Sequence, residues 1–158
     1  MKNCKELIAL LNLKEVGDHN YRGNSITVGS PIVFGGQVLA QAVNAAYRTI
    51  PGDRFLHSLH SYFLETGDLT IPINYHVAEM RNGGSFSTRR VTASQNNKTI
   101  FILAASFHKK EEGFEHQIKM NPSIKTPEEL LSWGDMVNQF GDFLPKSIKS
   151  FLSIERPI

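Results

Sequence analysis

Two adjacent glycines, Gly35 and Gly36, open directly into a segment with the spacing of an amphipathic helix, which we predict over residues 35–49. One face of this segment is built from small and medium apolar residues: Val38, Leu39, Ala42, Val43 and Ala46. Another face carries a polar stripe: Gln37, Gln41, Asn44 and Arg48. Because its apolar side chains are short, this helix can be wrapped closely by a β-sheet.

The start of such a helix is also a place where chemistry can occur. The first backbone N–H groups have no partner within the helix, and they lie at the positive end of the helix dipole. Glycines there let another group approach the backbone, because no Cβ stands in the way. The start of this helix is therefore placed to polarise a carbonyl or bind an anion. The alternative is that the glycine pair only forms a tight entry turn.

Four strand-like segments follow the helix in a row: residues 54–65, 71–81, 85–95 and 99–108. The turns between them are rich in turn-forming residues: Thr66-Gly67-Asp68, Asn82-Gly83-Gly84 and Asn96-Asn97. The nearly unbroken apolar run at residues 100–105 predicts burial on both faces of the last strand. One helix followed by hairpin-linked strands predicts an α+β fold, with an antiparallel sheet of about five strands around the Ala-rich helix. This is the hotdog arrangement.

The two ends of the chain are less regular. Residues 4–16 predict a short amphipathic helix, and residues 21–28 predict a strand that ends at Gly29-Ser30-Pro31. After Lys110 the sequence becomes linker-like, and a capping box at Thr126-Pro127-Glu128-Glu129 predicts a helix through about residue 139. We therefore expect a hotdog domain at residues 1–110, and a linker with a short helix at residues 111–158.

Composition excludes several classes of protein. The 158 residues suffice for one domain with a core, and a net charge of +2 with scattered basic residues does not favour nucleic acid. The single cysteine, Cys4, excludes an internal disulfide and a cysteine-based metal cage. No apolar run approaches the roughly 20 residues that cross a bilayer, and no signal-peptide pattern is present. We expect a cytoplasmic protein with no nucleic-acid or membrane partner.

Histidines are the first candidates for chemistry. His57 and His60 lie three residues apart on one predicted strand, so we expect their side chains on opposite faces, where they cannot bind one metal ion together. No metal-ligand motif is present either, and we expect no metal site. His60 shares its parity with Ser58 and Tyr62, which gives that face three polar-capable groups. A hydrogen-bonded structural histidine is the alternative for His60.

Two adjacent arginines, Arg89 and Arg90, alternate along another predicted strand. One of them could contact a phosphate, and a solvated arginine on an edge strand is the alternative. The sequence has no Gly-x-Ser-x-Gly elbow, no Walker A loop and no dinucleotide-binding fingerprint. These absences disfavour a serine hydrolase, a nucleotide hydrolase and a dehydrogenase.

Four motifs taken together are specific to one family: Phe34-Gly35-Gly36-Gln37-Val38, His57-Ser58-Leu59-His60-Ser61-Tyr62-Phe63-Leu64, Ser85-Phe86-Ser87-Thr88-Arg89-Arg90-Val91 and Phe114-Glu115-His116-Gln117. In order and spacing, residues 5–120 resemble the first half of acyl-CoA thioesterase II, the TesB-like enzymes with two hotdog units in one chain. The resemblance implies hydrolysis of fatty acyl-CoA to free fatty acid and CoA by direct attack of water, without metal or cofactor.

The resemblance also assigns roles to residues. It implies a catalytic contribution from three residues: His60, Gly36 and Gln37. It implies substrate contacts from six more: Phe34, Gly35, Ser58, Tyr62, Arg89 and Arg90. The expected partners are the acyl-CoA substrate and a second hotdog unit, or another copy of the chain, that covers the exposed edge of the sheet.

One departure from the family pattern is large. In these enzymes the Asp, Thr or Ser, and Gln that hold the hydrolytic water belong to the second unit, and no acid of this chain matches that Asp. We therefore expect a fragment of a longer enzyme that has little activity alone. A non-catalytic module for acyl-CoA binding or assembly is the alternative. A hotdog hydratase or dehydratase is a third reading, but Asp53 and His57 do not supply its acid–histidine pair convincingly.

Overall fold

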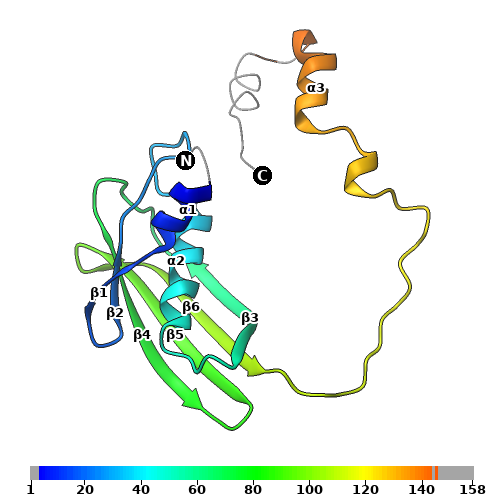
Figure 1. Ribbon diagram of the computed structural model, residues 1–158. Coiled ribbons are helices and arrows are strands. Elements are labelled where there is room, and N and C mark those ends of the chain that lie inside the picture. Colours follow the sequence, from blue (N-terminus) through cyan, green and yellow to red (C-terminus); the bar gives the residue numbers. More distant parts are fainter. Residues whose placement is uncertain (1–3, 144, 146–158) are drawn as a thin grey trace. The chain divides into compact units, whose positions relative to one another are not determined.

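A computed structural model describes residues 4–143 and 145 of the chain. The chain divides into two compact units, of which the first ends at Glu112 and the second begins at Gly113 (Figure 1). The first unit contains an antiparallel sheet of six strands and two helices. The described part of the second unit contains one α-helix, α3 (Trp133–Phe140), between two short 3-10 helices, η1 (Pro127–Glu129) and η2 (Gly141–Phe143).

The six strands are short at one edge of the sheet and long elsewhere: β1 (Lys14–Gly17), β2 (Asn20–Gly23), β3 (Arg54–Phe63), β4 (Ile73–Asn82), β5 (Phe86–Gln95) and β6 (Lys98–Lys109). Their order across the sheet is β1-β2-β4-β5-β6-β3, and neighbouring strands run antiparallel. Strand β3 therefore lies at an edge, with β6 as its one neighbour. The four long strands were predicted, whereas β1 was not, and the strand expected over residues 21–28 ends at Gly23.

Helix α2 (Gly35–Tyr47) packs against one face of the sheet, which we call the inner face (Figure 1). Its alanines Ala42, Ala45 and Ala46 are fully buried, which lets β4, β5 and β6 approach the helix closely. The predicted antiparallel sheet around an Ala-rich helix is thus confirmed. Helix α1 (Cys4–Leu11) contacts α2 and buries none of its own residues fully.

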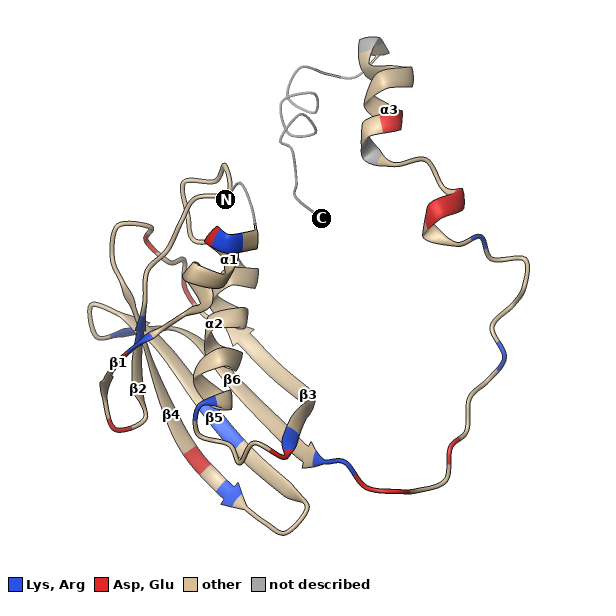
Figure 2. Ribbon diagram, viewed as in Figure 1, with Lys and Arg blue, Asp and Glu red and all other residues tan. Residues whose placement is uncertain are grey.

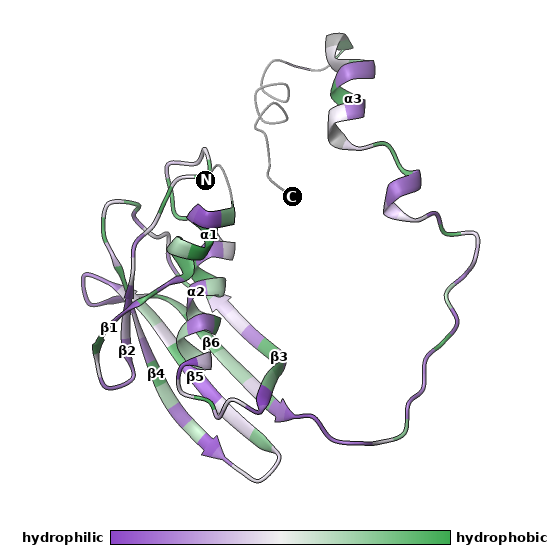
Figure 3. Ribbon diagram, in the orientation of Figure 1, coloured by the Kyte–Doolittle hydropathy of each residue, from purple (hydrophilic) through white to green (hydrophobic). Residues whose placement is uncertain are grey.

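The opposite side of the sheet, which we call the outer face, is not covered by any element of residues 4–112. In β6, Phe101, Leu103 and Ala105 are buried on the inner face, whereas Ile102 is half-buried and Ala104 is exposed. The prediction that residues 100–105 are buried on both faces is therefore wrong for this unit. Apolar and polar bands alternate along strand β4 in Figure 3, as expected for a sheet with one covered face.

Turn chemistry explains two further outcomes. Asn96 and Asn97 adopt φ values of 48° and 61° between β5 and β6, which confirms the predicted tight turn. The helix predicted through residue 139 is interrupted, because η1 ends at Glu129 and α3 begins at Trp133. A second capping box causes the interruption: the Ser132 hydroxyl accepts from the Asp135 N–H at 3.1 Å and starts a new helix.

Candidate functional site

A pocket of about 430 Å³ lies at the start of α2. Its lining is mostly apolar and comes from the loop before α2, the first turns of α2, the segment after β3 and the start of β6: Ile32, Val33, Gly35, Val38, Phe63, Leu64, Glu65, Thr66, Gly67, Ile100 and Phe101. The Val33 N–H donates to the Gly67 carbonyl at 3.0 Å, which ties two sides of the pocket together. Helix α2 contains no charged residue and is tan throughout in Figure 2.

The first turn of α2 leaves two backbone donors available. The Gln37 N–H donates to the Phe34 carbonyl at 3.0 Å, so it is already used within the turn. This bond weighs against Gln37 as a polarising donor. Among the described residues, no hydrogen bond is formed by the N–H groups of Gly35 or Gly36. These two groups are the ones that a carbonyl oxygen could bind.

An aromatic ring of the protein lies close to each of the two glycines. A Cβ at Gly35 would lie 3.0 Å from Cε1 of Phe63, and a Cβ at Gly36 would lie 2.5 Å from Cε1 of Phe34. Each distance is tighter than ordinary packing allows, so each ring occupies the space that a side chain would fill. The close approach predicted for this glycine pair is therefore made by Phe63 and Phe34.

The side chain of Gln37 is buried and holds the loop that precedes the helix. Its Oε1 accepts from the Ile26 N–H at 3.2 Å, and its Nε2 donates to the Asn24 carbonyl at 3.3 Å. Gln41, one turn later, donates to the same Asn24 carbonyl at 3.0 Å. The hydroxyl of Tyr75 in turn donates to Gln41 Oε1 at 2.7 Å. The predicted polar stripe of α2 thus includes buried contacts that fix the helix against its surroundings.

The candidate residues of β3 lie on the other side of the sheet from the pocket. Ser58, His60 and Tyr62 share the outer face and are exposed, and the rings of His60 and Tyr62 are 4.8 Å apart. His60 pairs with Ala104, which pairs with Arg90, so Arg90 also lies on this face. The predicted site residues therefore form an inner group at the start of α2 and a separate outer group on β3 and β5.

A β-bulge changes the predicted faces of β3. The register with β6 shifts between Leu56 and Ser58, which leaves His57 as the extra residue. His57 Nε2 lies 2.8 Å from Oγ of Ser106, which belongs to the outer face. His57 and His60 therefore both lie on the outer face, and the prediction that they point to opposite faces is wrong. No group of three or more His, Cys, Asp or Glu residues in the described part of the chain could hold a metal ion.

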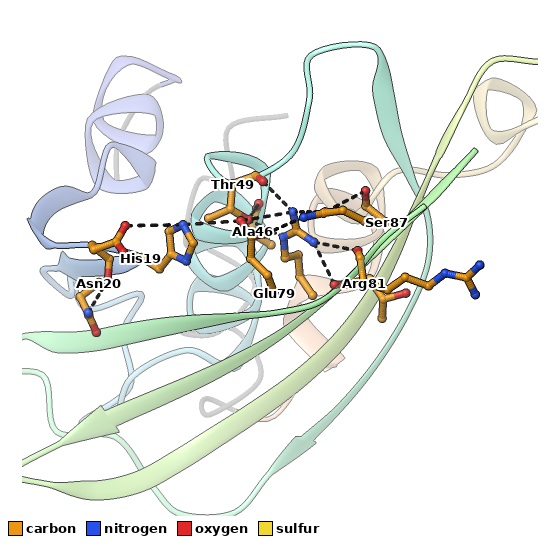
Figure 4. A network of polar contacts seen from close by, with 11 residues as sticks. His19, Asn20, Ala46, Thr49, Glu79, Arg81 and Ser87 are labelled. Atoms are coloured by element: carbon orange, nitrogen blue, oxygen red, sulfur yellow. Dashed lines mark hydrogen bonds and ion pairs between the residues drawn. The ribbon is translucent and has the colours of Figure 1, made fainter. Parts of the chain in front are cut away.

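Arg89 belongs to neither group. Its side chain is 1% exposed and lies on the inner face beside the C-terminal end of α2. Its Nε donates to Thr49 Oγ1 and its Nη2 to the Thr49 carbonyl, both at 2.7 Å, and Nη2 also donates to Asn82 Oδ1 at 2.7 Å. Glu79 adds an ion pair at 3.5 Å within the network of Figure 4. Burial lowers the pKa of Arg89, and Glu79 opposes that shift.

This burial bears on the predictions for the two arginines. Strand β5 is flanked by β4 and β6, so the alternative of an edge-strand arginine is wrong for both. Arg89 joins α2 to the sheet, and a phosphate would have to displace Thr49 and Asn82 to reach it. Arg90 is exposed on the outer face. The signal that sequence reasoning missed is Thr49, which sits at the end of the helix with a hydroxyl and a carbonyl for Arg89.

None of the helices in the described residues is long and apolar enough to cross a membrane.

Comparison with known proteins adds an independent line of observation. Residues 24–108 match a family model described as the acyl-CoA thioesterase N-terminal domain. Acyl-CoA thioesterase 2 of Haemophilus influenzae is 43% identical over 151 residues, which are 96% of this chain and 52% of that protein. Acyl-coenzyme A thioesterase 8 of Mus musculus is 41% identical over 134 residues, 84% of this chain and 42% of that protein. The chain thus spans about half the length of the curated relatives it matches.

Solved structures agree with the sequence comparisons. The acyl-CoA thioesterase II TesB2 of Mycobacterium marinum superposes with a TM-score of 0.69 at 37% identity, covering 84% of this chain and 48% of that one. A hot dog fold protein of Alicyclobacillus acidocaldarius superposes with a TM-score of 0.66 at 18% identity, covering 77% of this chain and 46% of that one. The second likeness concerns the fold alone, and the predicted hotdog fold is confirmed.

Proposed function

The chain belongs to the acyl-CoA thioesterase family through its N-terminal domain, and from that premise we propose that it is the N-terminal hotdog unit of an enzyme that hydrolyses fatty acyl-CoA. The observation that carries the proposal is the apolar pocket at the start of α2, which Gly35 lines, together with the unused N–H groups of Gly35 and Gly36 in the first turn of that helix. An acyl chain fits an apolar pocket, and a thioester carbonyl fits two unused backbone donors. The products are a free fatty acid and CoA.

The reaction requires two things from this unit: binding of the acyl chain and polarisation of the thioester carbonyl. Oxygen of a water molecule bonds to the thioester carbon, the carbon–sulfur bond breaks, and a proton goes to the CoA sulfur. Negative charge develops on the carbonyl oxygen, where the N–H groups of Gly35 and Gly36 stabilise it. The buried side chain of Gln37 holds the loop before the helix and so fixes the position of these donors. The resemblance assigns the residues that hold the water to the second unit.

Strand β3 is the place where that second unit would attach. As an edge strand it has backbone N–H and C=O groups along one side that β6 does not pair, and such an edge requires cover. A second hotdog unit, or another copy of this chain, supplies that cover by pairing with β3. Its side chains would then lie next to His60, Ser58 and Tyr62, and this is how the outer group would line a cleft between two units.

The remaining assignments complete the proposal. We place the enzyme in the cytoplasm, without nucleic-acid or membrane partners. We assign residues 111–158 to the linker that leads to the second unit; of these, residues 144 and 146–158 lie outside the described residues. Arg90, exposed on the outer face, is the arginine available for a phosphate of CoA.

A non-catalytic acyl-CoA-binding module is the second candidate, and one observation favours it. Glu65 is the one carboxylate in the pocket lining, and it forms an ion pair with Lys98 at 2.7 Å, so it is not poised as a general base. A hydratase or dehydratase has less support. Asp53 contacts Arg54 at 3.7 Å, while His57 contacts Ser106, so these two residues do not form the required pair.

Thiol release from a medium-chain acyl-CoA tests the proposal. The 158-residue chain is compared with a protein in which a second hotdog unit follows it. We expect hydrolysis by the two-unit protein and a rate lower by ~10²–10⁴-fold in the single unit, because a positioned base contributes about that much. Absence of hydrolysis by the two-unit protein across short, medium and long chains would contradict the enzyme, and acyl-CoA binding without turnover would establish the binding module instead.

A further inference from the structure

Phe63 lines the pocket and is also exposed to solvent. It is the last residue of the edge strand β3, its ring is part of the pocket wall, and the residue is nevertheless 57% exposed. The ring lies 4.9 Å from the ring of Phe101 and against the backbone of Gly35. A large apolar side chain thus separates the pocket from the edge of the sheet, with solvent on one side and the pocket on the other.

Three other large side chains of the pocket belong to the core, whereas Ile32 and Leu64 are exposed aliphatic residues at 47% and 51%. Phe101 is fully buried, and Val38 and Ile100 are each 4% exposed, so a change at any of them would disturb the packing between sheet and helix. Phe34, the other ring at the helix start, covers Gly36 but does not line the pocket. Phe63 is therefore the aromatic residue of the wall whose size can change without a cavity in the core.

We propose that Phe63 determines the length and width of the acyl chain that this pocket accepts. The inference rests on the proposed function and adds the residue that sets its specificity. With the ring in place the pocket ends at Phe63, so methylene groups beyond that point gain no apolar contact. Without the ring the pocket opens toward the edge of the sheet, and longer or branched chains continue to bury surface there.

The contact between Phe63 and Gly35 means that a change at Gly35 also moves this part of the pocket wall. A methyl group at Gly35 would lie 3.0 Å from Cε1 and 3.1 Å from Cζ of Phe63, so the ring must shift if Gly35 becomes Ala. The substitution Gly35→Ala should therefore alter chain-length preference when Phe63 is present, and it should lose that effect when Phe63 is Ala. This dependence is a coupling that a double-mutant cycle measures.

The test is a titration of the 158-residue chain with S-alkyl-CoA thioethers of increasing chain length, which cannot be hydrolysed. For the unchanged chain we expect affinity to rise about fourfold per methylene group, as apolar transfer predicts, and then to level off. Phe63→Ala should move that limit to longer chains, and Phe63→Leu should place it between the two. Phe55→Ala is the matched control, because Phe55 lies on the same strand and is 46% exposed, but on the outer face away from the pocket.

The outcomes separate this inference from the function on which it rests. If the unchanged chain binds thioethers and the limit is the same in Phe63→Ala, the assignment of Phe63 is overturned while the proposed function stands. If no thioether of any length binds to the unchanged chain, either alone or followed by a second hotdog unit, the proposed function fails, and the assignment fails with it. Circular dichroism of each variant establishes whether it is folded. If Phe63→Ala does not fold, the chain-length limit measured for Phe63→Leu decides in its place.

Discussion

The hydroxyl of Tyr75 on β4 donates a hydrogen bond of 2.7 Å to Oε1 of Gln41 on α2, and both residues are fully buried. The same Gln41 donates through Nε2 to the carbonyls of Leu10 and Asn24. One side chain thereby joins the sheet, α1 and the loop before α2. Because the loop also leads to the pocket, the stability of this contact and the geometry of the candidate site are linked.

Removal of the Tyr75 hydroxyl should destabilise the fold. In Tyr75→Phe the Gln41 oxygen loses a buried donor, which costs about 1–3 kcal/mol. Chemical denaturation of the 158-residue chain measures the loss. Tyr47→Phe is the control, because the Tyr47 hydroxyl accepts from the Leu56 N–H at 2.8 Å near the surface. A loss in Tyr75→Phe no larger than in Tyr47→Phe would contradict the role of the buried bond.

The same tyrosine predicts how stability depends on alkaline pH. Burial raises the pKa of Tyr75 above its ordinary value of 10.0. In the unfolded chain the phenol loses its proton near pH 10, whereas in the fold it keeps it, so the free energy of unfolding falls as pH rises above 10. Below pH 10 both states are protonated, and Tyr75 contributes no slope.

Tyr75→Phe isolates this contribution. The variant should be less stable at pH 8, yet its stability should fall less steeply from pH 10 upward, because it has no phenol at this position. Denaturation curves at a series of pH values up to 12 measure both slopes. Equal slopes in the variant and the unchanged chain would show that the phenol of Tyr75 ionises in the folded state.

Arg89 and Arg90 offer a comparison between neighbours of opposite environment. Arg89→Lys removes the planar fork that donates to Thr49 and Asn82, and an ammonium group cannot replace those bonds. We expect a loss of about 1–3 kcal/mol in the free energy of unfolding, because buried acceptors on Thr49 and Asn82 lose their donors. Arg90→Lys, on the exposed outer face, should change it by less than about 0.5 kcal/mol. Similar losses in the two variants, measured by urea denaturation, would contradict the structural role of Arg89.

Much of the fold could be predicted from the sequence, because its main signals are local. The Ala-rich face of α2 and the turn residues at Asn82-Gly83-Gly84 and Asn96-Asn97 determine a helix and hairpins without reference to distant residues. The short strand β1 escaped prediction, because four residues carry too little pattern. The one-sided burial of β6 escaped it as well, since Ile102 and Ala104 are apolar on an uncovered face.

The candidate site was harder to predict, because its geometry depends on long-range contacts. The bulge at His57 moves that histidine to the face of His60, and strict alternation along β3 cannot reveal it. The rings that cover the two glycines come from different parts of the chain: Phe34 precedes the helix and Phe63 ends β3. Sequence alone located the helix start correctly, but it could not show that aromatic rings lie beside both glycines.

The ring of Phe34 lies over Gly36 at the start of α2. The backbone at Gly36 does not require positive φ, so alanine fits its conformation, but the new methyl would lie 2.5 Å from Cε1 of Phe34. The exposed ring of Phe34 must therefore swing away in Gly36→Ala. In a Phe34→Ala background no ring is displaced, and Gly36→Ala should stabilise the fold by about 0.4–1 kcal/mol, because alanine loses less backbone entropy than glycine on folding.

The double-mutant cycle in thermal or chemical unfolding thus has a predicted sign: Gly36→Ala is more favourable without Phe34 than with it. Gly52→Ala is the control, because no atom lies within 4 Å of a Cβ placed at that turn, so its effect should be the same with and without Phe34. Additive effects of Gly36→Ala and Phe34→Ala would show that the ring does not rest on the helix start. In that case the N–H groups of Gly35 and Gly36 would be open to a ligand from both sides.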